Sequence, residues 1–248
     1  MSWLVEFRQN GNQNIALILG SGVVGTSIFR ELHFQHGFNF IPVNLEWGKS
    51  MRPIQKDLKS LISSLITDWS YSEGLDHHKI SYFDVVWAAG KTGFYSTEHN
   101  TKLENADFKC FLEFTQSMAH LFPNTCPGFH LMSSIGGLFE DQGLVSTNTE
   151  PRPLRPYGRL KLSQENLLRK FSPAVKPSIY RLSSVYGYIR QNQRVGLVSV
   201  LVQNTVLSRP TTINGSFNTL RDFVWASDVA RFIVNKISQK QNQQEITT

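Results

Sequence analysis

Tyr157 and Lys161 stand four residues apart in the segment Tyr-Gly-Arg-Leu-Lys. If this segment is helical, the spacing puts both side chains on one face of the helix. A tyrosine with an ordinary pKa of about 10 is a poor base at neutral pH, but a nearby ammonium favours the phenolate and lowers that pKa. The pair therefore predicts a group that exchanges a proton with a substrate. A surface tyrosine beside a solvated lysine is the alternative interpretation.

Two serines end an apolar segment upstream of this pair. Ser133 and Ser134 follow a predicted strand at Phe129–Met132, and Ser134 precedes Tyr157 by 23 residues. A hydroxyl at this place could orient a substrate oxygen against Tyr157. The sequence leaves open which serine does so. We favour Ser134 as the catalytic hydroxyl and regard Ser133 as a substrate contact.

A glycine-rich segment precedes all of these residues in the chain. It follows the continuous apolar run Ile15–Leu19 and opens a predicted helix at Thr26–Gln35. Glycines allow a sharp turn and a close approach of backbone to a pyrophosphate, and a helix N-terminus offers free N–H groups to it. The segment predicts a dinucleotide site, with a plain tight turn as the alternative. The expected contacts are Gly20, Ser21, Gly22, Val23, Val24 and Gly25.

Asn44 stands where an acidic residue normally binds the ribose hydroxyls of NAD, at the end of the second predicted strand, Phe40–Val43. An asparagine can bond a hydroxyl without repelling a phosphate, and Lys49 and Arg52 lie just beyond. This pattern favours NADP slightly over NAD. Alternatively, Glu46 performs the role of the acidic residue.

Strands and helices alternate along the rest of the chain. Further strands are expected at Phe83–Ala89 and Ser178–Leu182, and further helices at Asn105–Leu121 and Tyr157–Phe171. Such alternation is typical of a parallel sheet covered on both faces, which binds ligands at the carboxyl ends of its strands. The interval Trp47–Tyr82 shows no clear strand. We predict one Rossmann-like, doubly wound α/β domain over residues 1–248, with a tail at 239–248 that frays.

Composition restricts the functions that remain. The net charge is +6, and residues 150–194 hold ten Lys or Arg against two Glu. This excess fits a phosphate-bearing small ligand or a solvated surface, since no nucleic-acid readout motif accompanies it. Neither Cys110 nor Cys126 has metal-ligand spacing, so no metal is expected. No apolar run is long enough to cross a bilayer, no secretory signal is visible, and a cytoplasmic location is expected.

Together these motifs resemble those of an extended short-chain dehydrogenase/reductase of the NAD-dependent epimerase/dehydratase family, which acts on nucleotide sugars. The resemblance extends from Ile15 to Ile237. The residues that carry it, besides the Tyr-Lys pair, are Asp84–Ala89 with Gly90, Asn105, Glu150 with Pro153, Glu165, Arg181 with Val185–Gly187, and Arg221–Val224 with Asp228–Ala230. It implies that Lys161 also holds the nicotinamide ribose. It further implies cofactor contacts at Ala88, Ala89, Gly90 and Asn105, and nucleotide-sugar contacts at Arg181 and Arg221.

Three departures from the family pattern affect these expectations. The glycine loop is one residue shorter than usual, which would shift phosphate contacts. Residues 135–140 read IGGLFE in place of the family's small residues and VYG. For this reason, the choice between Ser133 and Ser134 as the catalytic hydroxyl stays open. The chain stops at Thr248, so we expect a shortened substrate-binding part around residues 183–222, with a pocket that is small, open or completed by a partner. A homodimer is one possible assembly.

Three functions are compatible with these observations. We favour hydride transfer that reduces a 4-keto nucleotide sugar, because Asn44 and the short C-terminal region suit an exchangeable cofactor. The alternatives are a 4-epimerase that holds NAD tightly, or a regulator that binds dinucleotide without turning it over. The presence of both Tyr157 and Lys161 favours catalysis over regulation. A dehydratase would need acidic residues where Ile135 and Gly136 stand.

Overall fold

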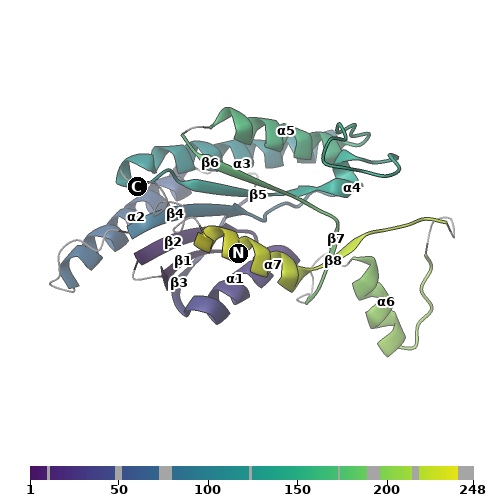
Figure 1. Cartoon of the computed structure of the whole chain (residues 1–248), viewed down its shortest axis with the longest axis horizontal. Coiled ribbons are helices and arrows are strands. Elements are labelled where there is room, and N and C mark those ends of the chain that lie inside the picture. The colour runs from purple at the N-terminus through teal and green to yellow at the C-terminus, as the bar shows by residue number, and fades with distance from the viewer. Residues whose placement is uncertain are drawn as a thin grey trace, which may run out of the picture.

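The computed structural model describes residues 1–9, 12–47, 52–72, 80–122, 125–172, 174–188, 196–213 and 218–239. Within these residues, a six-stranded sheet carries helices on both faces (Figure 1). Its strands are β1 (Ser2–Gln9), β2 (Asn12–Leu19), β3 (Phe38–Val43), β4 (Ile80–Trp87), β5 (Gly128–Ser134) and β6 (Lys176–Leu182). The helices are α1 (Val23–His36), α2 (Arg52–Ser72), α3 (Glu98–Ser117), the short α4 (Ile135–Leu138), α5 (Pro156–Lys170), α6 (Leu197–Val206) and α7 (Ala226–Gln239), with a 3₁₀ turn at Ala119–Leu121. The predicted doubly wound α/β fold is confirmed.

The strand order is β3-β1-β2-β4-β5-β6, and the strands from β2 to β6 run parallel. β1 is antiparallel to both of its neighbours, β2 and β3. The sequence analysis expected only parallel strands and did not identify β1 in the N-terminal segment. Residues 2–7 of this strand are nevertheless all buried, and four of these six are apolar, a burial pattern that suits an inner strand.

The insertion of β1 moves β3 one strand away from the glycine-rich segment. Because β1 is antiparallel, it begins at the carboxyl edge of the sheet, where Trp3 pairs with Ile18. Ser2 is fully buried there, and its Oγ accepts a hydrogen bond of 3.2 Å from the backbone N–H of Gly20. Ser2 therefore lies beside the end of β2. The chain that follows Val43 leaves from β3, which is the outermost strand on this side of the sheet.

Two apolar cores lie on opposite faces of the sheet. On one face, α2, α3 and α5 cover it with Leu58, Ile62, Phe108, Phe111 and Leu168. On the other face, α1 and α7 cover it with Ile28, Leu32, Ala230, Ile233 and Val234. Because both faces are filled by side chains, the ends of the strands are the parts of the sheet left for a ligand.

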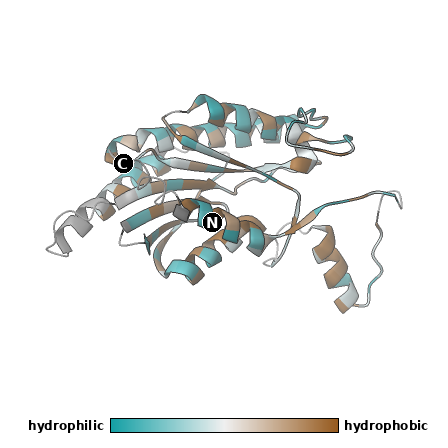
Figure 2. Cartoon of the chain, in the orientation of Figure 1, coloured by the Kyte–Doolittle hydropathy of each residue, from teal (hydrophilic) through white to brown (hydrophobic). Residues whose placement is uncertain are grey.

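A second, small sheet lies beyond the carboxyl end of β6. It pairs β7 (Ser184–Tyr186) with β8 (Phe223–Trp225) in parallel. Between them in sequence, α6 stands away from the main sheet and is apolar along most of its length (Figure 2). None of the residues of α6 is buried, and Val206 is 78% exposed. β7 and α6 fall within residues 183–222, where the sequence predicted a substrate-side segment, and this role stays a prediction.

One local expectation was wrong. The helix expected to open at Asn105 begins seven residues earlier, because the side chain of Thr97 accepts a hydrogen bond from the N–H of Asn100 and caps α3. The interval Trp47–Tyr82, in which the sequence showed no clear strand, holds the helix α2 and the first residues of β4. Lys49 and the predicted frayed segment 240–248 lie outside the described residues. No helix among those described is long and apolar enough to cross a membrane.

Candidate active site

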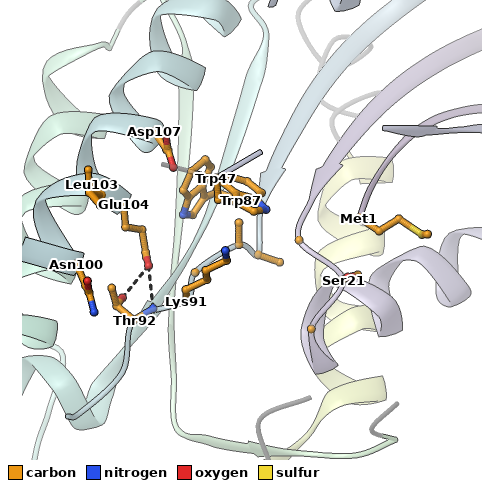
Figure 3. A pocket seen from close by; sticks show the side chains of 15 residues that line it. Met1, Ser21, Trp47, Trp87, Lys91, Thr92, Asn100, Leu103, Glu104 and Asp107 are labelled. Carbon is orange, nitrogen blue, oxygen red and sulfur yellow. Dashed lines mark hydrogen bonds between the residues drawn. The ribbon is translucent and has the colours of Figure 1, made fainter. Parts of the chain in front are cut away.

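Two adjoining cavities open at the carboxyl ends of the parallel strands, and Asn100 lines both. The first cavity, of about 510 Å³, lies between the glycine-rich segment, the end of β4 and one face of α3 (Figure 3). The second cavity, of about 940 Å³, lies between α4, the start of α5 and the chain that leads into β8. Parallel α/β sheets bind ligands at this edge, so the two cavities together form the candidate site.

The glycine-rich segment forms one wall of the first cavity by close backbone contacts. A Cβ on Gly20, whose φ is 101°, would lie 2.6 Å from the carbonyl oxygen of Ala88. A Cβ on Gly25 would lie 1.9 Å from the carbonyl oxygen of Gly20. A Cβ on Gly22, by contrast, would meet nothing within 4 Å. Gly20 and Gly25 are thus required by the turn itself, whereas the bare backbone of Gly22 borders open space in the cavity.

The N-terminus of α1 supplies an environment suited to phosphate. Gly22 is the N-cap residue, no side chain caps the helix there, and its first turn contains no acidic residue. The first backbone N–H groups of a helix lack partners within the helix, and the helix dipole favours an anion near them. A pyrophosphate therefore fits this wall of the cavity. Gly20, Ser21 and Gly22 line the cavity, whereas Val23, Val24 and Gly25 are not among its lining residues.

The opposite wall comes from β4 and α3. Ala88, Ala89 and Gly90 line the first cavity, and the N–H of Ala88 donates a 2.9 Å hydrogen bond to the carbonyl of Leu19. This bond holds the end of β4 beside the glycine-rich segment. Asn105 is not a lining residue, because its Nδ2 is directed to α5 and donates a 3.3 Å bond to Ser163 Oγ.

The structure does not bring Asn44 into the first cavity. Asn44 is exposed beyond β3, and Trp47 is the residue after β3 that lines the cavity, with Met1 lining it just before β1. The inserted strand β1 is the physical reason, since it separates β3 from β2. The argument for NADP from Asn44 assumed that these two strands are neighbours, and that assumption was wrong.

Tyr157 and Lys161 lie in the first two turns of α5, as their spacing predicted. Tyr157 lines the second cavity, and Lys161 Nζ lies 5.8 Å from the centre of its ring. Lys161 is only 5% exposed. Its ammonium donates hydrogen bonds to the carbonyl of Met132 at 3.3 Å and to Gln164 Oε1 at 3.2 Å. The lysine charge is thereby held beside the tyrosine.

The backbone of α4 determines where the tyrosine ring lies. A Cβ on Gly137 would stand 3.0 Å from two ring carbons of Tyr157, so the ring packs directly on this glycine. Phe94 is a second neighbour, with its ring centre 5.7 Å from that of Tyr157. Contacts with Gly137 and Phe94 restrict the ring, which leaves the hydroxyl as the part of Tyr157 suited to the second cavity.

The two serines at the end of β5 have different surroundings. Ser134 lines the second cavity together with Tyr157, and its Oγ accepts a 3.1 Å bond from the N–H of Gly137 as the N-cap of α4. Ser133 is buried, and its Oγ donates a 2.6 Å hydrogen bond to Glu165. Successive residues of a strand point to opposite faces, which accounts for the difference. Of the two hydroxyls, that of Ser134 is the one at the cavity.

Glu165 joins Ser133 to two arginines below the site. Arg181 Nε and Nη2 donate to its two oxygens at 3.0 and 2.8 Å, and Arg169 donates at 3.0 Å. Burial alone would raise the pKa of Glu165, but the hydrogen bonds from Arg181, Ser133 and Arg169 and the charge of Arg181 outweigh it and hold that pKa below its usual value. The same pairing raises the pKa of Arg181. Arg181 thus supports the strand that carries the serines, and it is not among the lining residues of either cavity.

Arg221 is exposed and lines the second cavity. It stands out because much of the basic excess between residues 150 and 194 is already paired. The described pairs there are Arg155 with Glu140, Arg159 with Glu98, Lys161 with Glu104, and both Arg169 and Arg181 with Glu165. These five basic side chains are therefore engaged within the protein. Arg221 is the lining residue that offers a guanidinium to a ligand in the second cavity.

Several lining residues escaped the sequence analysis. Trp47 and Trp87 border the first cavity with their ring centres 5.6 Å apart, and Glu104 and Asp107 contribute buried carboxyl groups. A signal for the α3 residues existed, since Asn100, Glu104 and Asp107 recur at helical spacing. Among the described residues, no cluster of His, Cys, Asp and Glu is arranged to hold a metal.

Comparisons with known proteins agree with this architecture. A sequence profile of the NAD dependent epimerase/dehydratase family matches residues 16–247. A dTDP-L-rhamnose 4-epimerase of Burkholderia thailandensis is 38% identical over 96 residues, 37% of this chain and 26% of that protein. An uncharacterized UDP-glucose epimerase of Bacillus subtilis is 37% identical over 107 residues, 42% of this chain and 33% of that one.

Solved structures resemble the fold. The UDP-glucuronic acid 4-epimerase from Bacillus cereus in complex with NAD superposes with a TM-score of 0.57 at 22% identity, over 89% of this chain and 62% of that chain. MoeE5, in complex with UDP-glucuronic acid and NAD, has a TM-score of 0.52 at 25% identity, over 62% of this chain and 51% of that one. The matched parts are less than two thirds of each of these four relatives.

Proposed function

Since the chain belongs to the NAD-dependent epimerase/dehydratase family, we propose that it binds NAD in the first cavity and a nucleotide sugar in the second, and that it moves a hydride between them. Three observations support a dinucleotide in the first cavity. These are the open space at Gly22, the uncapped N-terminus of α1 and the buried Lys161, whose Nζ lies 3.9 Å from the lining residue Glu104. NAD, when bound, supplies the hydride acceptor and donor.

The reaction that we propose is 4-epimerisation rather than the 4-keto reduction favoured from the sequence. The curated relatives carry epimerase names, and the two solved relatives bind NAD. The argument for a reductase depended partly on Asn44, which lies outside the first cavity. An epimerase needs a cofactor that stays bound while the hydride leaves the sugar and returns to its other face.

The chain's own residues would act on the proton of the sugar hydroxyl. Tyr157 would take this proton as hydride departs and return it when the hydride returns, thus serving as general base and then general acid. Lys161 would stabilise the phenolate form, since its ammonium lies 5.8 Å from the ring centre. The Ser134 hydroxyl, fixed by the N–H of Gly137, would hold the same sugar oxygen. Convergence of Tyr157 and Ser134 on one cavity is the observation that carries this proposal.

Arg221 would bind the diphosphate of the nucleotide sugar. A guanidinium matches two phosphate oxygens at once, and Arg221 lines the cavity without an ion pair among the described residues. The space around it, in a cavity of about 940 Å³, suits a ligand of nucleotide-sugar size. The proposed substrate class is therefore a hexose linked to UDP or dTDP, as the relatives' names suggest.

One experiment separates the possible functions. Purified protein is incubated with NAD and, in turn, UDP-linked and dTDP-linked hexoses, and the C4 configuration is followed by proton NMR while absorbance reports reduced cofactor. A C4 epimer without net cofactor consumption supports the proposal. Reduction of NAD in proportion to a 4-keto sugar formed, the reverse of 4-keto reduction, would restore the reductase interpretation. Cofactor binding without turnover of any sugar would favour the regulator.

A further inference from the structure

Glu104 brings a buried carboxylate to the wall of the first cavity. It lies on α3 and is 8% exposed. Its Oε2 accepts two hydrogen bonds from Thr92, one from the backbone N–H at 3.1 Å and one from Oγ1 at 2.7 Å (Figure 3). Its Oε1 accepts no hydrogen bond from the described residues. One oxygen of the carboxylate is therefore anchored, and the other retains its accepting capacity.

The free oxygen faces two features of the site. Lys161 Nζ lies 3.9 Å away, which is an ion pair but beyond hydrogen-bonding distance. On the other side, a Cβ on Gly90 would lie 2.9 Å from Oε1, so the carboxylate approaches the end of β4 where only a glycine leaves room. A buried acceptor without a hydrogen bond is costly, particularly when it is charged. A ligand that donates a hydrogen bond at this point would remove that cost.

The geometry points to a role for Glu104 in cofactor binding. We propose that Oε1 accepts a hydrogen bond from a hydroxyl of the nicotinamide-side ribose, the sugar that Lys161 also holds. This inference depends on the proposed function, which puts NAD in the first cavity. A ribose hydroxyl between the ammonium and the carboxylate can accept from one and donate to the other, so Oε1 gains the donor that its 3.9 Å separation from Lys161 denies it.

Glu104→Gln tests this hydrogen bond with little change in shape. Both groups of Thr92 that contact the side chain donate, so the amide oxygen of the glutamine must face Thr92. The amide NH₂ then occupies the place of Oε1, where it presents donors to Lys161 and to the ribose. The variant thereby removes the acceptor. Glu104→Asp keeps the charge but withdraws it by one methylene, and Lys161→Met removes the other proposed ribose contact.

The affinities of ADP-ribose and ADP, measured by titration calorimetry, distinguish a ribose contact from general damage to the cavity. ADP-ribose carries the nicotinamide-side ribose, and ADP lacks it. We expect Glu104→Gln to weaken ADP-ribose and NAD binding by about ten- to a hundredfold, as for loss of a charged hydrogen bond. ADP binding should change less than about threefold on the same scale. Glu104→Asp should give a smaller loss in the same direction.

Asp107→Asn is the matched control, because it removes a buried charge from the same helix and the same cavity. It should alter ADP and ADP-ribose affinities by the same factor. Equal losses for the two ligands in Glu104→Gln, or unchanged ADP-ribose affinity in a variant that melts like wild type, would overturn the inference while the proposed function stands. Wild-type protein that binds neither ADP, ADP-ribose nor NAD would overturn the proposed function and this inference with it.

Discussion

Gly158 of α5 and Gly137 of α4 are in direct backbone contact. A Cβ on Gly158 would lie 1.9 Å from the carbonyl oxygen of Gly137 and 2.7 Å from Cβ of Pro153. The same Gly137 supports the ring of Tyr157 and donates its N–H to Ser134. One point of contact between two helices therefore sets the positions of both side chains that are proposed to act on the substrate oxygen.

Gly158→Ala should separate α5 from α4. The backbone oxygen cannot move as a flexible side chain could, so we expect overpacking to cost about 1–3 kcal/mol of unfolding free energy. Gly143→Ala is the control, since its added methyl meets nothing within 4 Å. The free energies of unfolding of the two variants, measured in urea, should differ by an amount in this range. Equal midpoints would contradict the close contact between the two helices.

Gly22→Val should weaken NAD binding, whereas Gly25→Val should destabilise the fold. The side chain added at Gly22 enters open space in the first cavity, so calorimetry should record weaker NAD binding with a nearly unchanged melting temperature. The side chain added at Gly25 collides with Gly20, so the fold itself should suffer. An unchanged NAD affinity in Gly22→Val would contradict the pyrophosphate site.

Much of this arrangement could be predicted from sequence because it is local. The Tyr157–Lys161 pair, the turn at Gly20–Gly25 and the serines at the end of β5 each depend on one helix, one turn or one strand, and a periodic pattern reveals these elements. The position of Asn44 could not be predicted in this way. It depended on which strand pairs with β2, and that is decided by the long-range insertion of β1.

Glu104 was missed for a related reason. Helical spacing indicates that Asn100, Glu104 and Asp107 share a face, but the sequence alone does not say that this face meets Gly90 and Lys161. Arg181 illustrates the reverse case. A motif suggested that Arg181 contacts the nucleotide sugar, whereas in the fold its guanidinium donates hydrogen bonds to the buried Glu165.

Glu165 should make the protein sensitive to acid. Its pKa is lowered in the fold from the ordinary value of 4.5, so its stabilising effect is complete above that value and is lost as the pH falls through the lowered pKa. The free energies of unfolding of wild type and Glu165→Gln, measured in urea, should show a large gap at pH 7. The gap should narrow as the pH falls below about 4.5 and through the lowered pKa, because the unfolded chain then binds a proton that the folded protein binds only at lower pH. A gap that is independent of pH would contradict the role of the ion pairs.

Arg221→Lys should affect binding more than chemistry. Lysine keeps the charge but loses the two-point contact with phosphate, so KM for the nucleotide sugar should rise more than kcat falls. Arg181→Lys is a useful comparison, because its partner is Glu165 rather than the ligand and its main effect should be on stability. If Arg221→Lys lowered kcat alone, the residue would act in the chemical step instead.

Tyr157→Phe is the most direct test of the account, since it removes only the hydroxyl and retains the ring packed on Gly137 and Phe94. The measurement is kcat for the nucleotide sugar that the wild type converts, alongside the calorimetric affinity for NAD. Loss of general acid–base catalysis should lower kcat by about a hundred- to ten-thousandfold while the melting temperature and NAD affinity stay near wild type. A variant that keeps more than about half of the wild-type kcat would contradict proton transfer by Tyr157.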